Sequence, residues 1–541
     1  MVHVCFFQLC LTLVLYTTLF AYFFTDVVGQ DDDDGWENVD ESDNNFTEPT
    51  AYTGRKQVNI PQNDPLTPMD ALELIFDVGF FRRLKAETNR YARQCQTEVQ
   101  RRKWSIVTME ELQKFFAIII HMSLIHKPAL KDYFSTNPVL FSSFPSQIGL
   151  GRDRFLSILK YLHINDNSTY IPRDQVNHDP LHKVRPLVDL LNAKFKELYT
   201  PSCNITLDEA MIPFRGRIAF KVYMKNKPNK YGIRLEVVAD AENGIVLHFE
   251  AYTGAAGNQA NTVDDLVLRM LEPFKDKNFL VFMDRRYSSP NLFTKLRQKG
   301  FYPVGTVMKS RRGLPKSFTR KLRKGQIINR RKGDMLALKW KDKRDVFLLT
   351  TADRAEMVET GQNRHAQAGG DHETLKPAGV VRYNLGKVGV DRADQMASYY
   401  PMHRKTVKWW KKVFFGLFTM ALINLNKYMN MKNGSAMRLE TFLLNIATHL
   451  GNAELSTPTI PGAAAEPRRH VEWAPHFPIK LEPTASKANP TRQCVHCTKK
   501  HDVNGKRIRR ESSWKCKGCD VALCVGCFYP YHRPREASRQ R

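Results

Sequence analysis

Three Cys-x-x-Cys pairs near the carboxyl end place the strongest single constraint on how this chain can fold. The pairs are Cys494–Cys497, Cys516–Cys519 and Cys524–Cys527, and His532 follows the last of them. Paired thiols at this spacing are typical of structural zinc sites, in which Cys and His side chains surround the ion tetrahedrally. A disulfide framework is the alternative, but the four other cysteines are scattered and the segment is rich in Lys and Arg. We therefore expect a small cysteine-rich domain that binds Zn²⁺.

The number of zinc ions is left open by the spacing. Two tetrahedral ions need eight ligands, and the six cysteines with His532 supply seven. His496 and His501, and more remotely His476, are candidates for the eighth ligand. Either the first and third pairs share one ion in a cross-brace, or a single ion is bound and three thiols are spare.

The charge of the chain indicates the class of its partner. Its 541 residues include 82 Lys and Arg against 55 Asp and Glu, a formal net charge of +27. An excess of this size favours a polyanion, with nucleic acid ahead of an anionic membrane. The hydrophobic fraction of 42% is that of a folded globular chain, and the length predicts several domains.

Eleven of the basic residues fall between Lys309 and Asp334, against a single acidic residue. A run of this kind predicts contacts to DNA phosphates that do not read sequence. A solvated basic loop or a nuclear import signal is the alternative reading. The residues expected to contact DNA are Arg311, Arg312, Lys321, Arg323, Lys324, Arg330 and Arg331.

The amino-terminal residues contain two segments of opposite character. Residues 4–24 are uncharged and long enough to span a bilayer or to act as a signal peptide, although no Lys or Arg precedes them. A working signal would expose the clustered thiols to an oxidising compartment, so residues 1–28 are interpreted as an alternative or wrongly assigned start. Residues 29–66 are acidic and polar, and we expect a disordered tail there.

Helical periodicity dominates from residue 70 to about residue 200. Capping-box pairs at Asp70–Glu73 and Thr108–Glu111 and a proline at position 186 mark expected helix starts. Strand patterns follow. Residues 232–254 read as two β runs joined by a turn at Asn243–Gly244, and residues 279–284 read as a buried strand. The chain is therefore expected to be of the α/β class.

Carboxylates recur at the ends of these predicted strands. Asp208 follows the alternating run that starts at Asn204, and Asp284 ends the buried strand. Asp391 and Asp394 are three residues apart, which places them on one face if a helix begins at Asp391. Ordinary turn and cap residues would give the same pattern. If the carboxylates converge, they suit Mg²⁺ or Mn²⁺, two of which can promote an in-line phosphodiester displacement.

The residues around the aspartates resemble the piggyBac transposase family. Segments such as "TLDEAMIPFRGR", "YMKNKPNKYGIRL" and "GVDRADQM" carry the resemblance, which runs in the same order over about residues 68–535. It implies catalytic aspartates at Asp208, Asp284 and Asp391, with Asp394 as a supporting carboxylate. One stretch departs from the family: "DRRYSS" stands where "DNFYTS" is usual, so that Arg285 follows the second aspartate. That arginine would compete for the carboxylate or bind phosphate.

The resemblance also implies an RNase H-like catalytic core with an insertion domain, preceded by a helical domain and followed by a C-terminal zinc-binding cysteine-rich domain. With the composition, it divides the chain into a helical DNA-binding or dimerisation domain (67–200), a core in two parts (201–305 and 386–450), a basic insertion (306–385), a linker (451–492) and the cysteine-rich domain (493–535).

The implied function is cut-and-paste transposition by a nuclear homodimer that uses Mg²⁺ or Mn²⁺. It would act on double-stranded DNA, at transposon ends and TTAA target sites, and on no small-molecule substrate. The alternative is a domesticated, non-catalytic protein that keeps the fold and binds DNA. The intact aspartates favour the first reading, whereas Arg285 and the unusual amino terminus favour the second.

Overall fold

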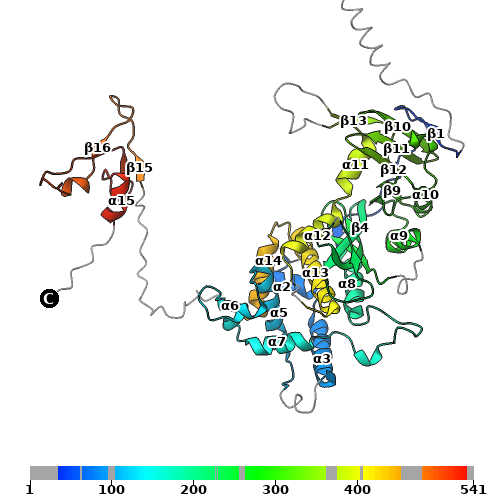
Figure 1. Ribbon diagram of the computed structural model, residues 1–541, viewed down its shortest axis with the longest axis horizontal. Helices are drawn as coiled ribbons and strands as arrows, with labels where there is room; N and C mark the ends of the chain where they lie inside the picture. The colour runs from blue at the N-terminus through cyan, green and yellow to red at the C-terminus, as the bar shows by residue number, and fades with distance from the viewer. Residues whose placement is uncertain are drawn as a thin grey trace, which may run out of the picture. The chain divides into compact units, whose positions relative to one another are not determined.

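The computed structural model describes residues 34–60, 64–95, 104–225, 227, 229–254, 262–360, 374–402, 406–452 and 478–532 (Figure 1). The chain divides into a larger unit, residues 1–455, and a smaller one, residues 456–541. Each unit is described here by itself. The apolar run at residues 4–24 and most of the predicted linker lie outside the described residues.

A mixed ten-stranded sheet runs through the larger unit in the order β1-β10-β11-β12-β9-β8-β4-β6-β5, and β7 also pairs with β6. Strands β4, β8 and β9 are parallel, whereas β6 and β7 are antiparallel to their neighbours. The strands are β1 (Glu37–Asn38), β4 (Asn204–Pro213), β5 (Val222–Tyr223), β6 (Tyr231–Asp240), β7 (Val246–Ala251), β8 (Leu280–Met283), β9 (Tyr302–Thr306), β10 (Ile327–Lys332), β11 (Met335–Lys341) and β12 (Asp345–Thr350).

The central order β7-β6-β4-β8-β9 is the RNase H-like core that the resemblance implied. The turn between β6 and β7 contains Asn243 and Gly244, as predicted, and Gly244 adopts a positive φ of 67°. The basic insertion does not form a separate layer. Its strand β12 pairs antiparallel with β9, so the insertion extends the core sheet sideways.

Most helices gather at the end of the larger unit away from β1 and β10, and others lie beside the sheet (Figure 1). They are α2 (Pro68–Glu73), α3 (Val78–Cys95), α5 (Met109–Leu124), α6 (Ser143–Gln147), α7 (Arg152–Tyr161), α8 (Arg185–Leu198), α9 (Val263–Leu271), α10 (Pro290–Gln298), α11 (Ala378–Gly386), α12 (Gly389–Tyr399), α13 (Trp409–Asn433) and α14 (Leu439–Leu450).

Two of the three predicted helix starts are confirmed and one is displaced. Thr108 and Glu111 form the expected capping box at the start of α5, and α8 has a proline in its first turn. The first box lies one turn earlier than predicted. Thr67 accepts from the Asp70 amide while the Asp70 carboxylate accepts from the Thr67 amide, so Asp70 closes the box instead of opening it.

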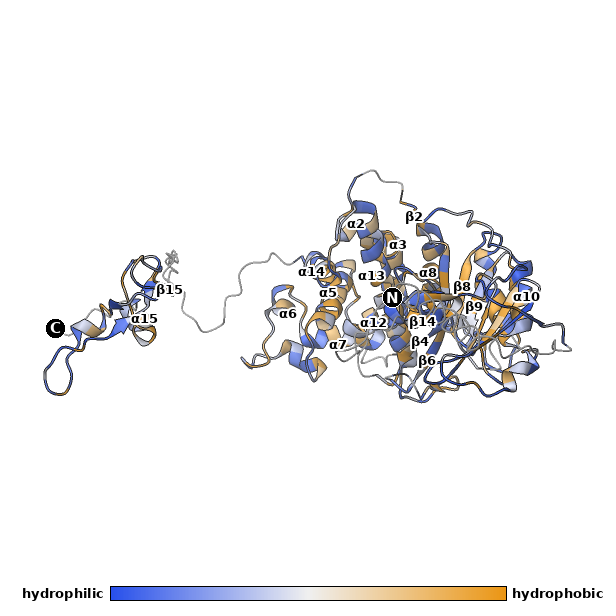
Figure 2. Ribbon diagram, turned by 90° about the horizontal axis from the view of Figure 1, so that it is seen from above, coloured by the Kyte–Doolittle hydropathy of each residue, from blue (hydrophilic) through white to orange (hydrophobic). Residues whose placement is uncertain are grey.

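Helix α13 joins the helical region to the sheet through one continuous core. Phe418 on α13 packs against Phe76 and Phe116, with ring centroids 4.7 and 5.0 Å apart. Trp410 at its start is 4% exposed and lies edge-on to His163 at 4.6 Å, as expected for a core residue. Figure 2 shows hydrophobic residues concentrated along the strands and the inward helices of this unit. The helical region therefore has no core independent of the sheet.

Among the residues that the structure describes, no helix has the length and apolar character needed to cross a membrane.

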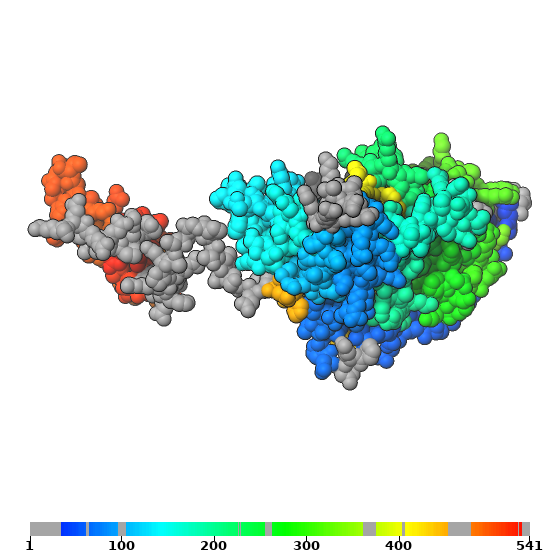
Figure 3. Space-filling model, turned by 90° about the horizontal axis from the view of Figure 1, so that it is seen from below, coloured from blue at the N-terminus to red at the C-terminus, as the bar shows by residue number. Residues whose placement is uncertain are grey.

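Residues 34–60, expected to belong to a disordered tail, form instead an ordered strap along the sheet. Strand β1 pairs with β10, and Trp36, 1% exposed, donates from Nε1 to the Gly313 carbonyl at 3.0 Å. Asp43 is 3% exposed and accepts from Arg331, at 2.7 Å for Nε, and from the Ala355 amide at 2.9 Å. In Figure 3 the dark-blue strap borders the green surface of the insertion. The acidic composition predicted disorder wrongly, because Asp43 of this segment is buried in an ion pair with Arg331 instead of being solvated.

The strap continues from the insertion to the core. The Thr50 amide donates to the Tyr302 hydroxyl at 2.7 Å, the Tyr52 hydroxyl donates to the Pro201 carbonyl at 2.9 Å, and Lys56 pairs with Glu242 at 2.7 Å. Near its end, β2 (Gln57–Val58) pairs with β3 (Tyr199–Thr200). The strap thus closes the outer edge of the insertion and reaches the turn between β6 and β7.

Replacing Asp43 by Asn should destabilise the larger unit. The change leaves the Arg331 guanidinium buried without its carboxylate, a loss of about 3–5 kcal/mol for a broken buried pair, and Asn tolerates the positive φ of 37° at this position. Thermal unfolding of the full chain measures the effect. Asp40→Asn is the matched control, because Asp40 is exposed and its carboxylate accepts from the amide and the hydroxyl of Ser42. Equal melting temperatures for the two variants would contradict the strap's role.

Candidate active site and metal centres

Two adjacent parallel strands bring Asp208 and Asp284 side by side. The register of β4 with β8 ends at the pair Leu207 and Met283, so an aspartate comes next on each strand. Equivalent positions on neighbouring strands face the same side of a sheet. Asp284 follows the end of β8 as predicted, but Asp208 lies within β4, because β4 continues to Pro213 against β6 after β8 has ended.

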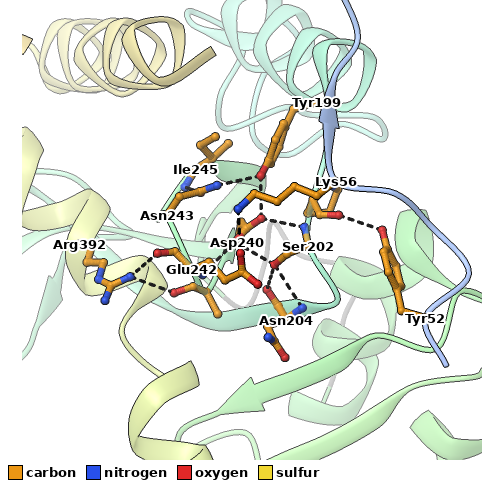
Figure 4. A network of polar contacts seen from close by, with 12 residues as sticks. Tyr52, Lys56, Tyr199, Ser202, Asn204, Asp240, Glu242, Asn243, Ile245 and Arg392 are labelled. Carbon is orange, nitrogen blue, oxygen red and sulfur yellow. Dashed lines mark hydrogen bonds and ion pairs between the residues drawn. The ribbon is translucent and has the colours of Figure 1, made fainter. Parts of the chain in front are cut away.

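Helix α12 carries Asp391 and Asp394 to the same side of the sheet. Its first residue, Gly389, is packed so closely on β4 that a Cβ there would lie 2.4 Å from Cγ2 of Thr206. Arg392, three residues further along the same face, holds the helix by donating to the carbonyls of Ala241, at 3.3 Å, and Glu242 (Figure 4). A small residue and a long cation together fix where the first turn of α12 lies.

Asp240, fully buried, organises the polar network beneath that turn. Its carboxylate accepts from the Tyr199 hydroxyl at 2.8 Å and from the Ser202 amide at 2.9 Å, and the Glu242 amide binds it at 2.9 Å (Figure 4). The network joins the end of α8, the start of β4 and the turn that receives Arg392. The position of α12 is therefore tied to the strand that carries Asp208.

Lys227 and Tyr383 show that the aspartates converge. The Lys227 ammonium lies 3.9 Å from Asp391 and 3.5 Å from Asp394, and it donates to the Glu209 carbonyl at 2.8 Å. Tyr383 lies on α11. Burial raises the pKa of its hydroxyl to about 12, and the negative charges of Asp284, Asp208 and Asp391 add to that rise. Three aspartates from separate elements thus act on one hydroxyl.

A threonine links the tyrosine to the second aspartate. Thr306 donates to Oδ1 of Asp284 at 3.2 Å, and its hydroxyl lies 3.3 Å from that of Tyr383. Burial raises the pKa of Asp208 to about 8, with a further contribution from Glu209, and it raises that of Asp394 to about 6 against the opposing charge of Lys227. Crowded carboxylates of this kind favour a bound cation, which would lower both pKa values.

The donor set fits a hard divalent cation. Asp208, Asp284 and Asp391 supply only oxygen ligands, the type that Mg²⁺ and Mn²⁺ prefer. In the part of the chain that the structure describes, three or more ligand atoms within 4.8 Å of one another occur only in the cysteine-rich unit. The aspartates are therefore gathered around one face but not closed onto a single point.

A buried polar cluster that the sequence analysis missed holds the loop after Asp284. Glu236 on β6 is 1% exposed and accepts from the Tyr287 hydroxyl at 2.5 Å, while Arg286 lies 3.4 Å from Glu236 and 3.9 Å from Glu209. The Tyr287 hydroxyl also lies 3.2 Å from Glu209. Because Glu209 follows Asp208, the cluster couples β4 to the loop after β8. A glutamate inside the apolar run "RLEVV" was the available signal.

Arg285 does not compete for Asp284 in the way that the sequence predicted. Its backbone amide donates to Oδ1 of Asp284 at 2.6 Å, but its side chain is exposed and forms no ion pair with any residue that the structure describes. Arg286 points instead to the cluster of Glu236 and Glu209. The two arginines of "DRRYSS" therefore have different surroundings.

The residues expected to contact DNA are also divided. Arg330 and Arg331 are 1% and 2% exposed and bind Asn38 and Asp43 of the strap, so their prediction as DNA contacts is corrected. Arg311 is half-buried and donates from Nη2 to the carbonyls of Arg285 and Arg286, at 2.9 Å each. The exposed members of the set are Arg312, Lys321, Arg323 and Lys324.

A basic surface nearer the aspartates was not predicted. Arg215, Lys221, Lys230 and Tyr231 line a depression of about 570 Å³. The loop between β4 and β6, which supplies three of these residues, also carries Lys227. Four of its residues are Lys and two are Arg, so the signal was present in "RGRIAFKVYMKNKPNK".

The smaller unit holds two groups of metal-ligand atoms. Cys494, Cys497, Cys524 and Cys527 form the first group, and Cys516, Cys519 and His532 form the second. The first and third Cys-x-x-Cys pairs thus meet, which is the cross-brace alternative. The Cys497 thiol lies 3.4 Å from that of Cys527, and the Cys519 thiol lies 3.6 Å from Nε2 of His532.

The elements of this unit are short, so its core is made largely of the thiols. Strand β15 (Pro478–Lys480) pairs with β18 (Trp514–Cys516), β16 (Arg492–Gln493) pairs with β17 (Glu511–Ser512), and α15 (Val525–His532) ends at the histidine. Nδ1 of His532 lies 2.8 Å from the Phe528 carbonyl, which turns Nε2 towards the second group. His496 and His501 join neither group, and His476 lies outside the described residues.

Comparisons with known proteins agree with this architecture. A family model described as "Transposase IS4" matches residues 67–425, about two thirds of the chain. Human piggyBac transposable element-derived protein 2 is 26% identical over 378 residues, which cover 67% of this chain and 61% of that protein. Human piggyBac transposable element-derived protein 3 is 23% identical over 493 residues, covering 88% of this chain and 78% of that protein. The match thus spans about three fifths of the first relative's length.

A solved structure shows the same fold. The cryo-EM structure of a piggyBac transposase synaptic complex with hairpin DNA superposes with a TM-score of 0.64, covering 87% of this chain and 98% of that chain. The two sequences are 22% identical, so the likeness concerns the fold.

Arg286 and Glu236 should be energetically coupled. Arg286→Phe, which introduces the residue usual in the related sequences, removes a half-buried cation from Glu236 but leaves Arg234 at 2.8 Å, so it should lower stability by about 1.5 kcal/mol. Combining it with Glu236→Leu should recover part of that loss, a coupling of about 1–3 kcal/mol. A double-mutant cycle in urea measures the coupling.

The neighbouring residue supplies the control for that cycle. Arg285→Asn alters an exposed side chain and should change stability by no more than about 0.5 kcal/mol. Strictly additive effects of the Arg286 and Glu236 substitutions would show that the two residues do not form a pair.

Proposed function

The chain belongs to the piggyBac family of transposases, and from this premise we propose that it cleaves double-stranded DNA at transposon ends and joins those ends to TTAA sites. The observation that carries the proposal is that adjacent parallel strands place Asp208 and Asp284 side by side, while Lys227 links the β4 backbone to Asp391 of α12. The three aspartates come from β4, from the end of β8 and from α12, which are far apart in the sequence. Carboxylates gathered from distant elements onto one face suit phosphoryl transfer better than they suit ordinary turns.

Asp208, Asp284 and Asp391 would hold Mg²⁺ or Mn²⁺. When bound, these cations activate the attacking oxygen and stabilise the leaving oxygen of an in-line displacement. Thr306 orients Asp284 through its hydroxyl, and Lys227 holds Asp394 and the first turn of α12 near β4. The buried pair of Arg286 and Glu236 fixes the loop that follows Asp284.

DNA is the proposed partner. Exposed cations on the insertion and on the loop between β4 and β6 would bind its phosphates without reading sequence. They are Arg312, Lys321, Arg323, Lys324, Arg215, Lys221 and Lys230. A nuclear location and a homodimer, as in a complex that holds two DNA ends, belong to the same proposal.

Two Zn²⁺ ions are proposed for the cysteine-rich unit. Thiolate and imidazole donors select zinc over hard cations, and each group of ligand atoms is small enough to surround one ion. A metal-held unit of this kind would help to recognise the transposon ends.

A transposase-derived DNA-binding protein without catalysis is the second candidate. Arg285 favours it, because an exposed guanidinium beside Asp284 places positive charge close to where a cation would bind. The DNA-binding surface and the cysteine-rich unit would serve both candidates equally.

Replacing Asp208, Asp284 or Asp391 by Ala should abolish cleavage and leave DNA binding intact. Each loses a ligand that positions a cation, so the rate should fall about 100-fold or more. Phosphate contacts elsewhere should preserve affinity. Excision from a TTAA-flanked donor in Mg²⁺ or Mn²⁺ measures cleavage, and fluorescence anisotropy measures binding.

Asp153→Ala is the control for these variants, because Asp153 is exposed on α7 and bonds only Arg152 in the part of the chain described. Undiminished nicking by the aspartate variants would refute the assignment of the site. A wild-type protein that binds DNA and never nicks it, with Arg285→Asn no better, would establish the second candidate.

The purified full chain should contain two zinc ions. Cys497→Ser and Cys519→Ser should each remove one of them, since the two cysteines belong to different groups of ligand atoms. Cys95→Ser should keep both, because Cys95 is exposed on α3 and lies in neither group. Elemental analysis of each variant gives the stoichiometry, and a wild-type value of one would reject a zinc site at one of the two groups.

A further inference from the structure

A cavity of about 750 Å³ in the larger unit is not used by the proposed catalytic site. Its walls come from four places: the segment between α7 and α8, the loop between β4 and β6, the residues after β7, and the start of α13. Its volume lies within the range of sites that enclose small organic ligands.

Aromatic rings form one part of the wall. Phe220 and Trp409 meet edge to face, with ring centroids 5.3 Å apart. Tyr170 is 45% exposed, and its ring is braced edge-on by His178 and His182, each at 5.6 Å. A braced ring that remains accessible is suited to stacking against a planar group.

The rest of the wall is polar and positively charged. Arg173 and Lys183 line the cavity, as do the amide side chains of Gln175 and Asn177, and no Asp or Glu is among the lining residues. The pKa of Lys183 is lowered, first by burial and then by the nearby charge of Lys408. Cations that repel one another beside an aromatic ring favour an anionic ligand, and amides can hydrogen-bond to the edge of a base.

One loop joins this cavity to the aspartates. The loop between β4 and β6 contributes Phe220 to the cavity and Lys227 to the carboxylates of Asp391 and Asp394. Lys221 and Lys230, on the same loop, line the basic depression described above. Positive charge therefore extends along a single loop from the site of proposed cleavage to the cavity.

We propose that this cavity binds an unpaired nucleotide of the DNA, with its base against Tyr170 and its phosphate beside Arg173 and Lys183. The inference rests on the proposed function only for the identity of the polyanion. An aromatic face supplies stacking, the amides contact a base edge and the cations hold the backbone, which is the combination that single-stranded nucleic acid requires. A fully paired duplex would leave its bases stacked within the helix and out of reach of this wall.

The test compares two DNA duplexes of the same sequence, one fully paired and one with a single extrahelical 2-aminopurine. The full-length protein is used in buffer without Mg²⁺ or Mn²⁺, so that binding is measured apart from cleavage. We expect about fivefold or greater preference for the extrahelical base, the lower end of the contribution from stacking one base. Quenching of 2-aminopurine fluorescence should accompany binding.

Tyr170→Leu should remove the preference and the quenching while leaving affinity for the paired duplex unchanged. Tyr170 is partly exposed, so the variant should melt at the wild-type temperature. Tyr399→Leu is the matched control, because Tyr399 is 55% exposed on α12 and does not line the cavity. It should keep both the preference and the quenching.

Two further arms identify the source of the nucleotide and the class of nucleic acid. A duplex with a single-stranded overhang, if preferred over the internal extrahelical base, assigns the cavity to a strand end; the reverse order assigns it to a flipped base. No preference in the wild type, a preference retained by Tyr170→Leu, or tighter binding of single-stranded RNA of the same sequence would each overturn the inference. Because cleavage is not measured, a protein that fails to cut DNA can still show the preference.

Discussion

Mutual repulsion among carboxylates is the constraint on which the arrangement of the larger unit depends. Asp208, Asp284, Asp391 and Asp394 carry like charges towards one face, and burial makes the charged forms of Asp208 and Asp394 still less favourable. The surrounding structure holds them there with few nearby cations. Lys227 pairs with the two aspartates of α12, and Arg392 fastens that helix to backbone carbonyls instead of to a carboxylate. A site kept short of positive charge in this way remains able to bind divalent cations.

Several arginines elsewhere in the larger unit contact the protein itself instead of lying free on its surface. The net charge of +27 suggests a surface covered in cations, yet Arg330 and Arg331 are buried under the strap and Arg286 is half-buried against Glu236. Arg331 and Arg286 lie beside acids that the fold itself has buried, Asp43 and Glu236. Net charge alone therefore overstates how many cations can meet DNA.

Local sequence predicted the parts of the site whose signals lie within a few residues of each other. The run before Asp284, the spacing of Asp391 and Asp394 and the three Cys-x-x-Cys pairs needed no knowledge of distant residues. The strap could not be found in this way, because Asp43 is ordered by Arg331, which lies 288 residues away. The same holds for Arg286 and Glu236, which are fifty residues apart. Neither the unusual arginine nor the glutamate within an apolar run indicates, from its own neighbours, that the two side chains meet.

The insertion contacts both Asp284 and the loop that follows it. Arg311 leaves the insertion to bind the carbonyls of Arg285 and Arg286, and Thr306, where β9 passes into the insertion, binds Asp284 directly. The next residue, Arg312, is exposed and is one of the cations proposed to meet phosphate. A phosphate bound by Arg312 would therefore lie next to Arg311, whose side chain hydrogen-bonds to the loop after Asp284. Strand β12 pairs with β9 and β9 pairs with β8, so the sheet also connects the insertion to the strand that precedes Asp284. DNA bound on the insertion would thus help to set the position of Asp284. Binding of DNA and the arrangement of the proposed metal ligands would then depend on each other.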